Sequence, residues 1–224
     1  FALAACGESK SDSGKINGST SENSTGNQTA SGSLSETQND KNVKSDGTAQ
    51  GKNKSLVVYF SWSGNTEKVA KSIQSQTGSD IFEIVPKTPY SSDYNTVVAD
   101  AKTEQQKKAR PEISGKIDNI ADYDTVYVGF PNWWGDMPMI LYTFFDTYDL
   151  SGKTVSLFCT SGGSGLSNTV NEVKSLEPGA DVTEGLHIGS GSASAPDEAV
   201  KQWLEKIGAF NVSDSSSDES NEKI

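Results

Sequence analysis

The sequence predicts an α/β fold built on a doubly wound, five-stranded parallel sheet. Short apolar runs rich in β-branched residues recur between residues 56 and 188, and segments of helical periodicity separate them. This alternation favours a parallel sheet that is covered by helices on both faces and connected by right-handed crossovers. In addition, loops rich in glycine, hydroxyl and tryptophan residues follow three of the strand-like runs. Ligands of such sheets bind at the carboxyl ends of the strands, where the strand order reverses.

The five predicted strands are short and contain few polar residues, as expected for strands buried on both faces. They are Leu56–Phe60, Ile81–Val85, Thr125–Phe130, Thr154–Cys159 and Val182–Ile188.

Five helices are predicted between and after these strands. They are Glu67–Thr77, in which Val69, Ala70 and Ile73 share a face, the polar Asn95–Arg110, the short Met139–Thr147, a fourth marked by the spacing of Leu166, Val170, Val173 and Leu176, and a last from about Pro196 to Ile207. For the last helix, Ser194 is predicted to be the N-cap, Pro196 suits the first turn, and Gly208 follows the end.

The composition divides the chain into one domain and two polar segments. Residues 7–54 contain almost no large apolar side chain, so they cannot bury enough surface to offset the entropy of ordering and are predicted to be a disordered linker. Residues 55–210 have the size of one ordinary domain. Residues 211–224 are rich in serine and acidic residues and are predicted to be a disordered tail.

The extreme N-terminus indicates a lipid anchor. Leu3-Ala4-Ala5-Cys6 resembles the bacterial lipobox, which implies a signal-peptide remnant over residues 1–6, cleavage before Cys6 and lipidation of its sulfur. The chain begins without Met, so we expect it to be a fragment that lacks the charged start of the signal. A flexible linker of this length spans roughly 40 Å. No run approaches eighteen apolar residues, so the expected location is extracytoplasmic, with membrane contact through the lipid anchor only.

Charge and cysteine content exclude several classes of function. The net charge is −11, whereas residues 1–54 contain six basic and six acidic residues, so the excess of acid lies in the domain and the tail. This argues against nucleic acid as a partner and favours a partner with a basic docking face. With one histidine and two cysteines, neither a disulfide framework nor a histidine- or thiolate-built metal site is expected. Cys159 is predicted to be a buried small hydrophobic residue.

The loop after the first strand has the features of a phosphate cradle. Ser61-Trp62-Ser63-Gly64-Asn65-Thr66 leads from a strand into a helix, whose first N–H groups and dipole favour an anion. Ser61, Ser63 and Thr66 add hydroxyl donors, and Gly64 allows close backbone approach. Neither the G-x-x-x-x-G-K-[ST] nor the G-x-G-x-x-G motif is present at this loop, which indicates a mononucleotide. The alternative is a strand–turn–helix junction with a well-capped helix and no ligand.

Three stretches together resemble the flavodoxin-like family. They are Tyr59–Thr66, Gly129–Pro138 (Gly-Phe-Pro-Asn-Trp-Trp-Gly-Asp-Met-Pro) and Phe158–Gly165 (Phe-Cys-Thr-Ser-Gly-Gly-Ser-Gly). They are similar to the branch of the family found in bacterial lipoproteins and quinone-reductase-type proteins, and the resemblance covers roughly Leu56 to Phe210. It implies the strand order 2-1-3-4-5, of which flavodoxin is the standard example, and FMN at the switch point between the first and third strands.

The resemblance also implies roles for the second and third loops. In Pro131-Asn132-Trp133-Trp134-Gly135, one tryptophan would form a flat wall for the flavin ring, and the alternative is that one or both pack under the loop. The sequence does not distinguish Trp133 from Trp134. Asp136 is either a helix cap or a charge that disfavours the reduced flavin anion. In the third loop, the residues implied to meet the ring edge are Thr160, Ser161, Gly162, Gly163 and Gly165, and the alternative is a flexible turn before the next helix.

Two further features, Pro89–Tyr94 and His187, lie outside the three loops. Pro89–Tyr94 would border the substrate or partner side of the flavin, although Tyr90 and Tyr94 are equally well explained as packing residues. His187 is predicted to cap a strand end rather than to contact a substrate. The third loop is not a nucleophile elbow, and no catalytic side chain is predicted.

The sequence therefore predicts an FMN-binding flavoprotein that transfers electrons at the outer face of the cell membrane. The redox partner would be a protein or a quinone-type small molecule. Two alternatives stay open, an NAD(P)H-dependent quinone reductase that uses FMN and a non-redox binding module on the same fold. Whether the protein is an electron carrier or an enzyme is left undecided.

Overall fold

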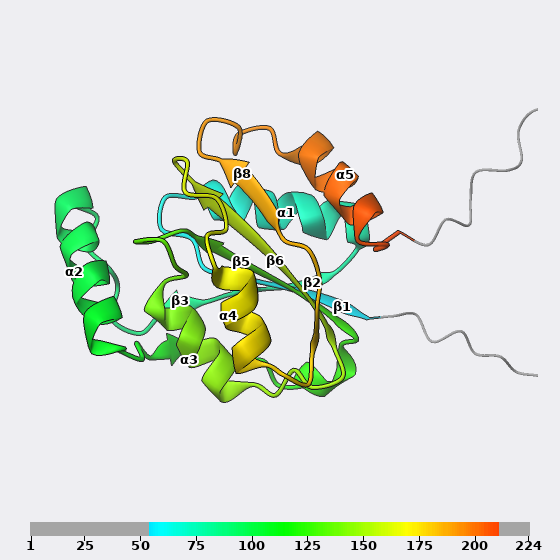
Figure 1. Ribbon diagram of the computed structural model, residues 1–224, viewed down its shortest axis with the longest axis horizontal. Helices are drawn as coiled ribbons and strands as arrows, with labels where there is room; N and C mark the ends of the chain where they lie inside the picture. Colours follow the sequence, from blue (N-terminus) through cyan, green and yellow to red (C-terminus); the bar gives the residue numbers. More distant parts are fainter. Residues whose placement is uncertain (1–53, 211–224) are drawn as a thin grey trace, which may run out of the picture. The chain divides into compact units, whose positions relative to one another are not determined.

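The computed structural model describes residues 54–210, whose centre is a parallel sheet. Its strands are β1 Ser55–Tyr59, β2 Asp80–Glu83, β5 Thr125–Pro131, β6 Thr154–Ser161, β7 Asp181–Val182 and β8 Leu186–Gly189. They follow the order β2-β1-β5-β6-β7, with β8 also paired to β6, and every pairing is parallel (Figure 1). This is the predicted order 2-1-3-4-5, so the predicted fold class is confirmed. The predicted lipid anchor, linker and acidic tail lie outside the described residues.

Helices cover both faces of the sheet. Helices α1 (Asn65–Thr77) and α5 (Asp197–Lys206) lie on one face, and α3 (Met139–Thr147) and α4 (Thr169–Leu176) lie on the other (Figure 1). Alternate residues of β1 serve the two layers: Val57 and Tyr59 join the core under α1 and α5, whereas Leu56 and Val58 join the core with α3. Because both faces are buried, the central strands β1 and β5 are nearly continuous apolar runs rather than alternating ones.

Helix α2 (Tyr94–Lys107) stands beside the sheet rather than over it (Figure 1). Of its residues only Val97 and Ala101 are buried, which agrees with its polar sequence. Asp93 caps the helix by accepting the Thr96 N–H at 2.8 Å. The segments around α2 form a short antiparallel ladder of β3 (Val85–Pro86) and β4 (Ile113–Ser114), and a 3₁₀ turn at Ile120–Asp122 precedes β5. Neither the ladder nor the 3₁₀ turn was predicted.

The fifth predicted strand, Val182–Ile188, is not continuous. Val155 of β6 pairs with Val182 and Phe158 pairs with Leu186, so the edge strand contains one residue more than its neighbour over this interval. This is the geometry of a bulge. Its cause is tertiary: the Glu184 carbonyl accepts the Trp203 indole N–H at 2.9 Å, and a Cβ on Gly185 would lie 2.7 Å from Leu166.

The last helix begins next to its predicted start at about Pro196, but its predicted N-cap is wrong. The N-cap of α5 is Pro196 and no side chain caps it, so Ser194 does not have the predicted role. The acidic residues Asp197 and Glu198 occupy the first turn instead, where they complement the helix dipole. The fourth helix begins at Thr169, and Leu166 lies in the preceding turn.

Residues 54–210 contain neither a candidate membrane span nor a candidate metal site. No helix in this part of the chain has both the length and the apolar character needed to span a bilayer. Within the same range, no three or more His, Cys, Asp or Glu side chains are grouped so that they could hold a metal ion.

Candidate functional site

The first loop turns sharply into α1. Gly64 is the N-cap residue and has a left-handed backbone (φ 81°), which glycine adopts without strain. The Ser61 hydroxyl accepts the Gly64 N–H at 3.1 Å and keeps its own proton available as a donor. The Trp62 indole N–H donates to the Ser91 carbonyl at 2.9 Å, so this side chain is engaged with the segment before α2.

The start of α1 suits an anion. No side chain caps this helix end, so its first N–H groups are available to a ligand. The nearest acid, Glu67, is paired with Lys71 of the next turn. Thr66 is only 1% exposed, and its hydroxyl is 2.9 Å from that of Thr160. Two hydroxyls that share one hydrogen bond leave one proton to donate elsewhere. The geometry is therefore compatible with the predicted phosphate cradle. The donors that it offers to a phosphate, backbone N–H groups and hydroxyls, are all neutral.

The second loop closes on itself in a tight turn. Trp133 donates its N–H to the Asp136 carbonyl at 2.8 Å, and Asp136 donates back to the Trp133 carbonyl at 3.2 Å. The two central residues are both left-handed, with φ 57° at Trp134 and 79° at Gly135, as in a type I′ turn. A bulky residue in this region is strained by about 1–3 kcal/mol, and such strain is frequent at functional sites.

The two tryptophans have different surroundings. Trp133 is partly buried, and its ring meets those of Phe60 and Tyr90 edge-on, with centroids 5.5 and 5.2 Å away. Trp134 is 52% exposed and lies against α2: its indole N–H donates to the Val98 carbonyl at 3.0 Å, and Lys102 lies 4.9 Å from its ring centre. Trp133 thus packs under the loop, which was one of the two alternatives from the sequence. Trp134 fixes the loop to α2.

Asp136 has a structural role next to the turn. Its carboxylate accepts the Met137 N–H at 2.7 Å and the Tyr142 hydroxyl at 2.9 Å. Asp136 does not cap α3, because the N-cap of this helix is Pro138 and no side chain caps it. The helix-cap interpretation of Asp136 is therefore wrong. Both carboxylate oxygens are engaged, and they hold the end of the second loop on α3.

The third loop is organised around Ser161. This residue is 7% exposed, and its hydroxyl accepts the N–H groups of Gly163 and Gly165 at 3.2 and 3.1 Å. The His187 Nε2 atom lies 2.9 Å from the same hydroxyl. Beside it, the Cys159 thiol donates to the Gly165 carbonyl at 3.1 Å, and burial raises the pKa of this thiol to about 12. The prediction that Cys159 is a buried small residue is confirmed.

Direct hydrogen bonds join the three loops. Asn132 donates its backbone N–H to the Thr160 carbonyl and its side-chain amide to the Gly165 carbonyl, both at 2.9 Å. The Thr66–Thr160 pair connects the first loop to the third. Residues 61–66, 131–136 and 160–165, which we call the loop rim, therefore form one connected surface at the ends of β1, β5 and β6. This is the edge at which α/β sheets bind ligands.

The glycines of the third loop border open space. A Cβ added to Gly162, Gly163 or Gly165 would meet no atom within 4 Å. The backbone of this loop can therefore be approached closely by a flat ligand, which fits the edge of a flavin ring.

Residues outside the predicted site support the loop rim. Only a strand-end role was predicted for His187, and neither its contact with Ser161 nor the contact of Tyr90 with Trp133 was expected. His187 is the single histidine of the chain, and this was the one feature of the sequence that could have drawn attention to it as a site residue. Nothing in the sequence shows that it faces a residue 26 positions away.

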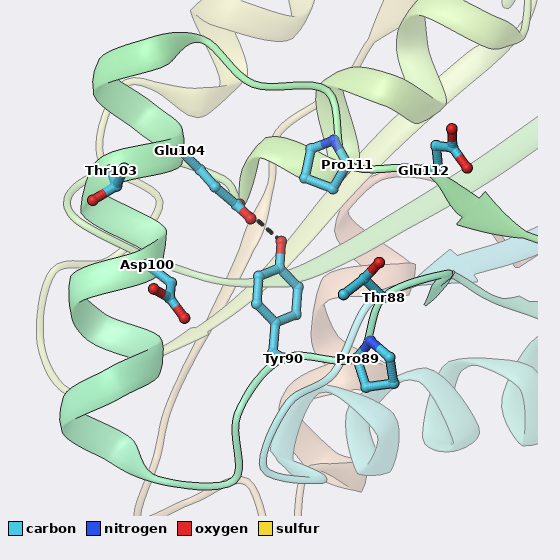
Figure 2. A pocket seen from close by; sticks show the side chains of 8 residues that line it. All are labelled: Thr88, Pro89, Tyr90, Asp100, Thr103, Glu104, Pro111 and Glu112. Carbon is cyan, nitrogen blue, oxygen red and sulfur yellow. Dashed lines mark hydrogen bonds between the residues drawn. The ribbon is translucent and has the colours of Figure 1, made fainter.

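A cavity of about 330 Å³ shares Tyr90 with the aromatic contacts of Trp133. Its lining is drawn in Figure 2: Thr88, Pro89, Tyr90, Asp100, Thr103, Glu104, Pro111 and Glu112. The Tyr90 hydroxyl donates to Glu104 at 2.9 Å (Figure 2). Burial raises the pKa of the Glu104 carboxyl, and the Tyr90 hydrogen bond opposes this rise. With three carboxyl groups in its wall, this cavity repels phosphate and does not compete with the first loop.

The fold and the loop rim define an α/β protein with a candidate ligand site at the switch point of a doubly wound sheet. A sequence profile of the flavodoxin family matches residues 54–207. The chain therefore belongs to the flavodoxin family. A search of curated proteins returned no match.

Solved structures agree with this assignment. A candidate flavoprotein from Bacteroides eggerthii is 36% identical, with 69% of this chain and 98% of that one covered at a TM-score of 0.62. Another from Bacteroides uniformis is 35% identical, with coverages of 68% and 98% and the same TM-score of 0.62. A flavoprotein from Lactobacillus acidophilus, solved in complex with FMN, is 27% identical, with coverages of 67% and 98% and a TM-score of 0.55.

Proposed function

We propose that this protein binds FMN at the loop rim and transfers electrons through it. Family membership and the FMN complex of the Lactobacillus acidophilus relative support the cofactor. The observation that carries the proposal is the hydrogen-bonded connection of the three loops over the ends of β1, β5 and β6. Bound FMN supplies the electron or hydride chemistry, and the residues of the chain bind and orient it.

The phosphate of FMN lies at the start of α1. The free N–H groups of the first helical turn, together with the Ser61 and Thr66 hydroxyls, donate to it. No Lys or Arg occurs between Ser61 and Thr66, so no side-chain cation within this turn takes part.

The ring lies between the second and third loops. Trp133 or Trp134 provides an aromatic contact, and the glycine-rich backbone of residues 160–165 approaches the ring edge. Because Asn132 bonds to both loops, the spacing between the two walls is fixed before the ring enters. This preorganisation lowers the entropic cost of binding.

The reaction partner is either a redox protein with a basic face or a quinone-type small molecule. The net charge of −11, carried by residues outside the neutral segment 1–54, supports the basic protein partner. No nucleic acid is involved, for the same electrostatic reason.

The central experiment is a spectroscopic titration of the purified chain with FMN. We expect saturable quenching of flavin fluorescence, a yellow complex and bleaching on anaerobic reduction. Rapid NAD(P)H oxidation that depends on an added quinone would assign the protein as a reductase instead of a carrier. A chain that fails to bind FMN, or that binds it without redox turnover, would contradict the electron-transfer proposal and favour the non-redox binding module.

The membrane location belongs to the same proposal and is supported by the sequence alone. Lipidated Cys6 anchors the domain at the outer face of the cell membrane, with residues 7–54 as its tether. In the bacterial host, the wild type should sediment with membranes, and Cys6→Ala should be released or remain unprocessed. Cys159→Ala, which removes the other cysteine, is the control and should stay with the membranes. A soluble wild type that retains its signal would contradict the lipid anchor.

A further inference from the structure

The histidine at the edge of the sheet completes the hydrogen bonding of Ser161. A hydroxyl has one donor and two acceptor sites. The Gly163 and Gly165 N–H groups occupy the acceptor sites of the Ser161 hydroxyl. The hydroxyl proton must therefore point to the His187 Nε2 atom at 2.9 Å, which has to be unprotonated in this arrangement.

The Ser161 hydroxyl fixes a loop that has little rigidity of its own. Gly163 and Gly165 have left-handed φ values of 152° and 63°, and glycine loses the most conformational entropy on ordering. The space beside the Cα atoms of Gly162 and Gly163 is open, so packing does not hold them. The loop backbone is held instead by hydrogen bonds, and those of the Gly163 and Gly165 N–H groups are both accepted by the Ser161 hydroxyl. The direction of this hydroxyl is set by His187.

We propose that His187 is a positioning residue for the flavin ring: by accepting the Ser161 hydroxyl it holds residues 162–165 in the shape that receives the ring, and its protonation releases them. This inference rests on the proposed function, because it assigns the ring to this loop. A protonated imidazole is a donor at both nitrogens. Three donors would then compete for two acceptor sites on Ser161, so at least one glycine N–H bond is lost and ring affinity falls.

Besides Ser161, the groups that could affect the imidazole come from the elements around β8. On the face of the sheet that His187 occupies, α4 carries Glu172 and Lys174. Leu186 and Ile188 join the core under α5, so strand alternation directs His187 to the opposite face of β8. The titratable groups of α5, which are Asp197, Glu198, Lys201, Glu205 and Lys206, are therefore on the other side. On β6 the titratable group is Cys159, which pairs with His187 in register and bonds to Gly165. Glu184, three residues before His187, is paired with Lys206.

The first test uses the flavin-free chain and amide hydrogen exchange. In the wild type, the protection factors of the Gly163 and Gly165 amides should fall as the pH is lowered from 8 to 5. In His187→Ala they should be low at every pH. In His187→Gln, whose amide oxygen accepts a hydrogen bond but does not titrate, they should be close to wild type and independent of pH. Lys206→Ala, which breaks the exposed ion pair with Glu184, three residues before His187, should behave as the wild type.

The second test measures flavin binding over the same pH range. His187→Ala should weaken FMN and riboflavin by the same factor, about two- to tenfold, which is the effect of one neutral hydrogen bond. Unfolding by urea should change little, since His187 is exposed and the loop that it holds contributes little packing. Wild-type protection and affinity in His187→Ala, or a wild-type pH profile in His187→Gln, would overturn the inference. A wild type that binds neither flavin would refute the proposed function, whereas the exchange data would still decide whether His187 holds the loop.

Discussion

The buried Thr66–Thr160 pair allows the phosphate site to be tested without confusing binding with folding. Thr66→Val keeps the shape of the side chain and removes its hydroxyl. In the free protein this leaves the Thr160 hydroxyl, on a residue only 4% exposed, without its partner at 2.9 Å, which should cost about 1–3 kcal/mol of stability. In the complex it also removes a hydrogen bond to a charged group, worth about 1.5–3 kcal/mol or about 10- to 150-fold in Kd.

A double-mutant cycle separates these two effects. In Thr66→Val/Thr160→Val both hydroxyls are absent, and apolar groups of the same shape in place of both partners should restore most of the stability. Thr160→Val alone should destabilise the free protein but leave the ratio of FMN to riboflavin affinity near its wild-type value. Every variant with Val at position 66 should lose FMN affinity, whereas riboflavin, which has no phosphate, should be affected little.

The assays are quenching of flavin fluorescence for both ligands and urea unfolding of the flavin-free chain. Equal loss of FMN and riboflavin in Thr66→Val would mean that the hydroxyl does not contact phosphate. Full recovery of FMN affinity in the double variant would mean that Thr66 acts only through Thr160. Either result would refute the assignment of residues 61–66 as the phosphate cradle.

The domain boundary, the tryptophan loop and the buried thiol can each be tested separately. A chain limited to residues 55–210 should bind FMN as tightly as the full chain in the fluorescence titration, and a large loss would refute the domain boundary. Trp133→Ala should destabilise the protein by about 1–3 kcal/mol in urea, because two aromatic pairs are lost, whereas Trp134→Ala, at an exposed position, should change stability by less than about 1 kcal/mol. Of these two variants, the one that contacts the ring should weaken FMN and riboflavin alike; if neither does, the ring does not lie on this loop. In the 55–210 chain, Cys159 should resist alkylation at pH 8, since its pKa of about 12 keeps it protonated, and mass spectrometry should detect modification only after unfolding.

The sequence by itself determined the architecture of this protein. Strands buried on both faces must be apolar throughout, so β1, β5 and β6 could be recognised from composition and length alone. The helix Met139–Thr147 was predicted at the residues where it occurs, directly after Pro138. The order of the three loops along the chain placed the candidate site at the switch point, since parallel strands bring their carboxyl ends to one edge.

Only the tertiary structure decided how the side chains of that site are used. The bulge between β7 and β8 depends on the contacts of Gly185 with Leu166 and of Glu184 with Trp203. The separate surroundings of Trp133 and Trp134 depend on where α2 stands, and the anchoring of the third loop depends on the register of His187 against Cys159. Periodicity and turn chemistry are local properties, whereas these contacts join residues that are distant along the chain. Which of them meet is fixed by strand register and by the path of the connections, and one sequence read segment by segment does not contain that information.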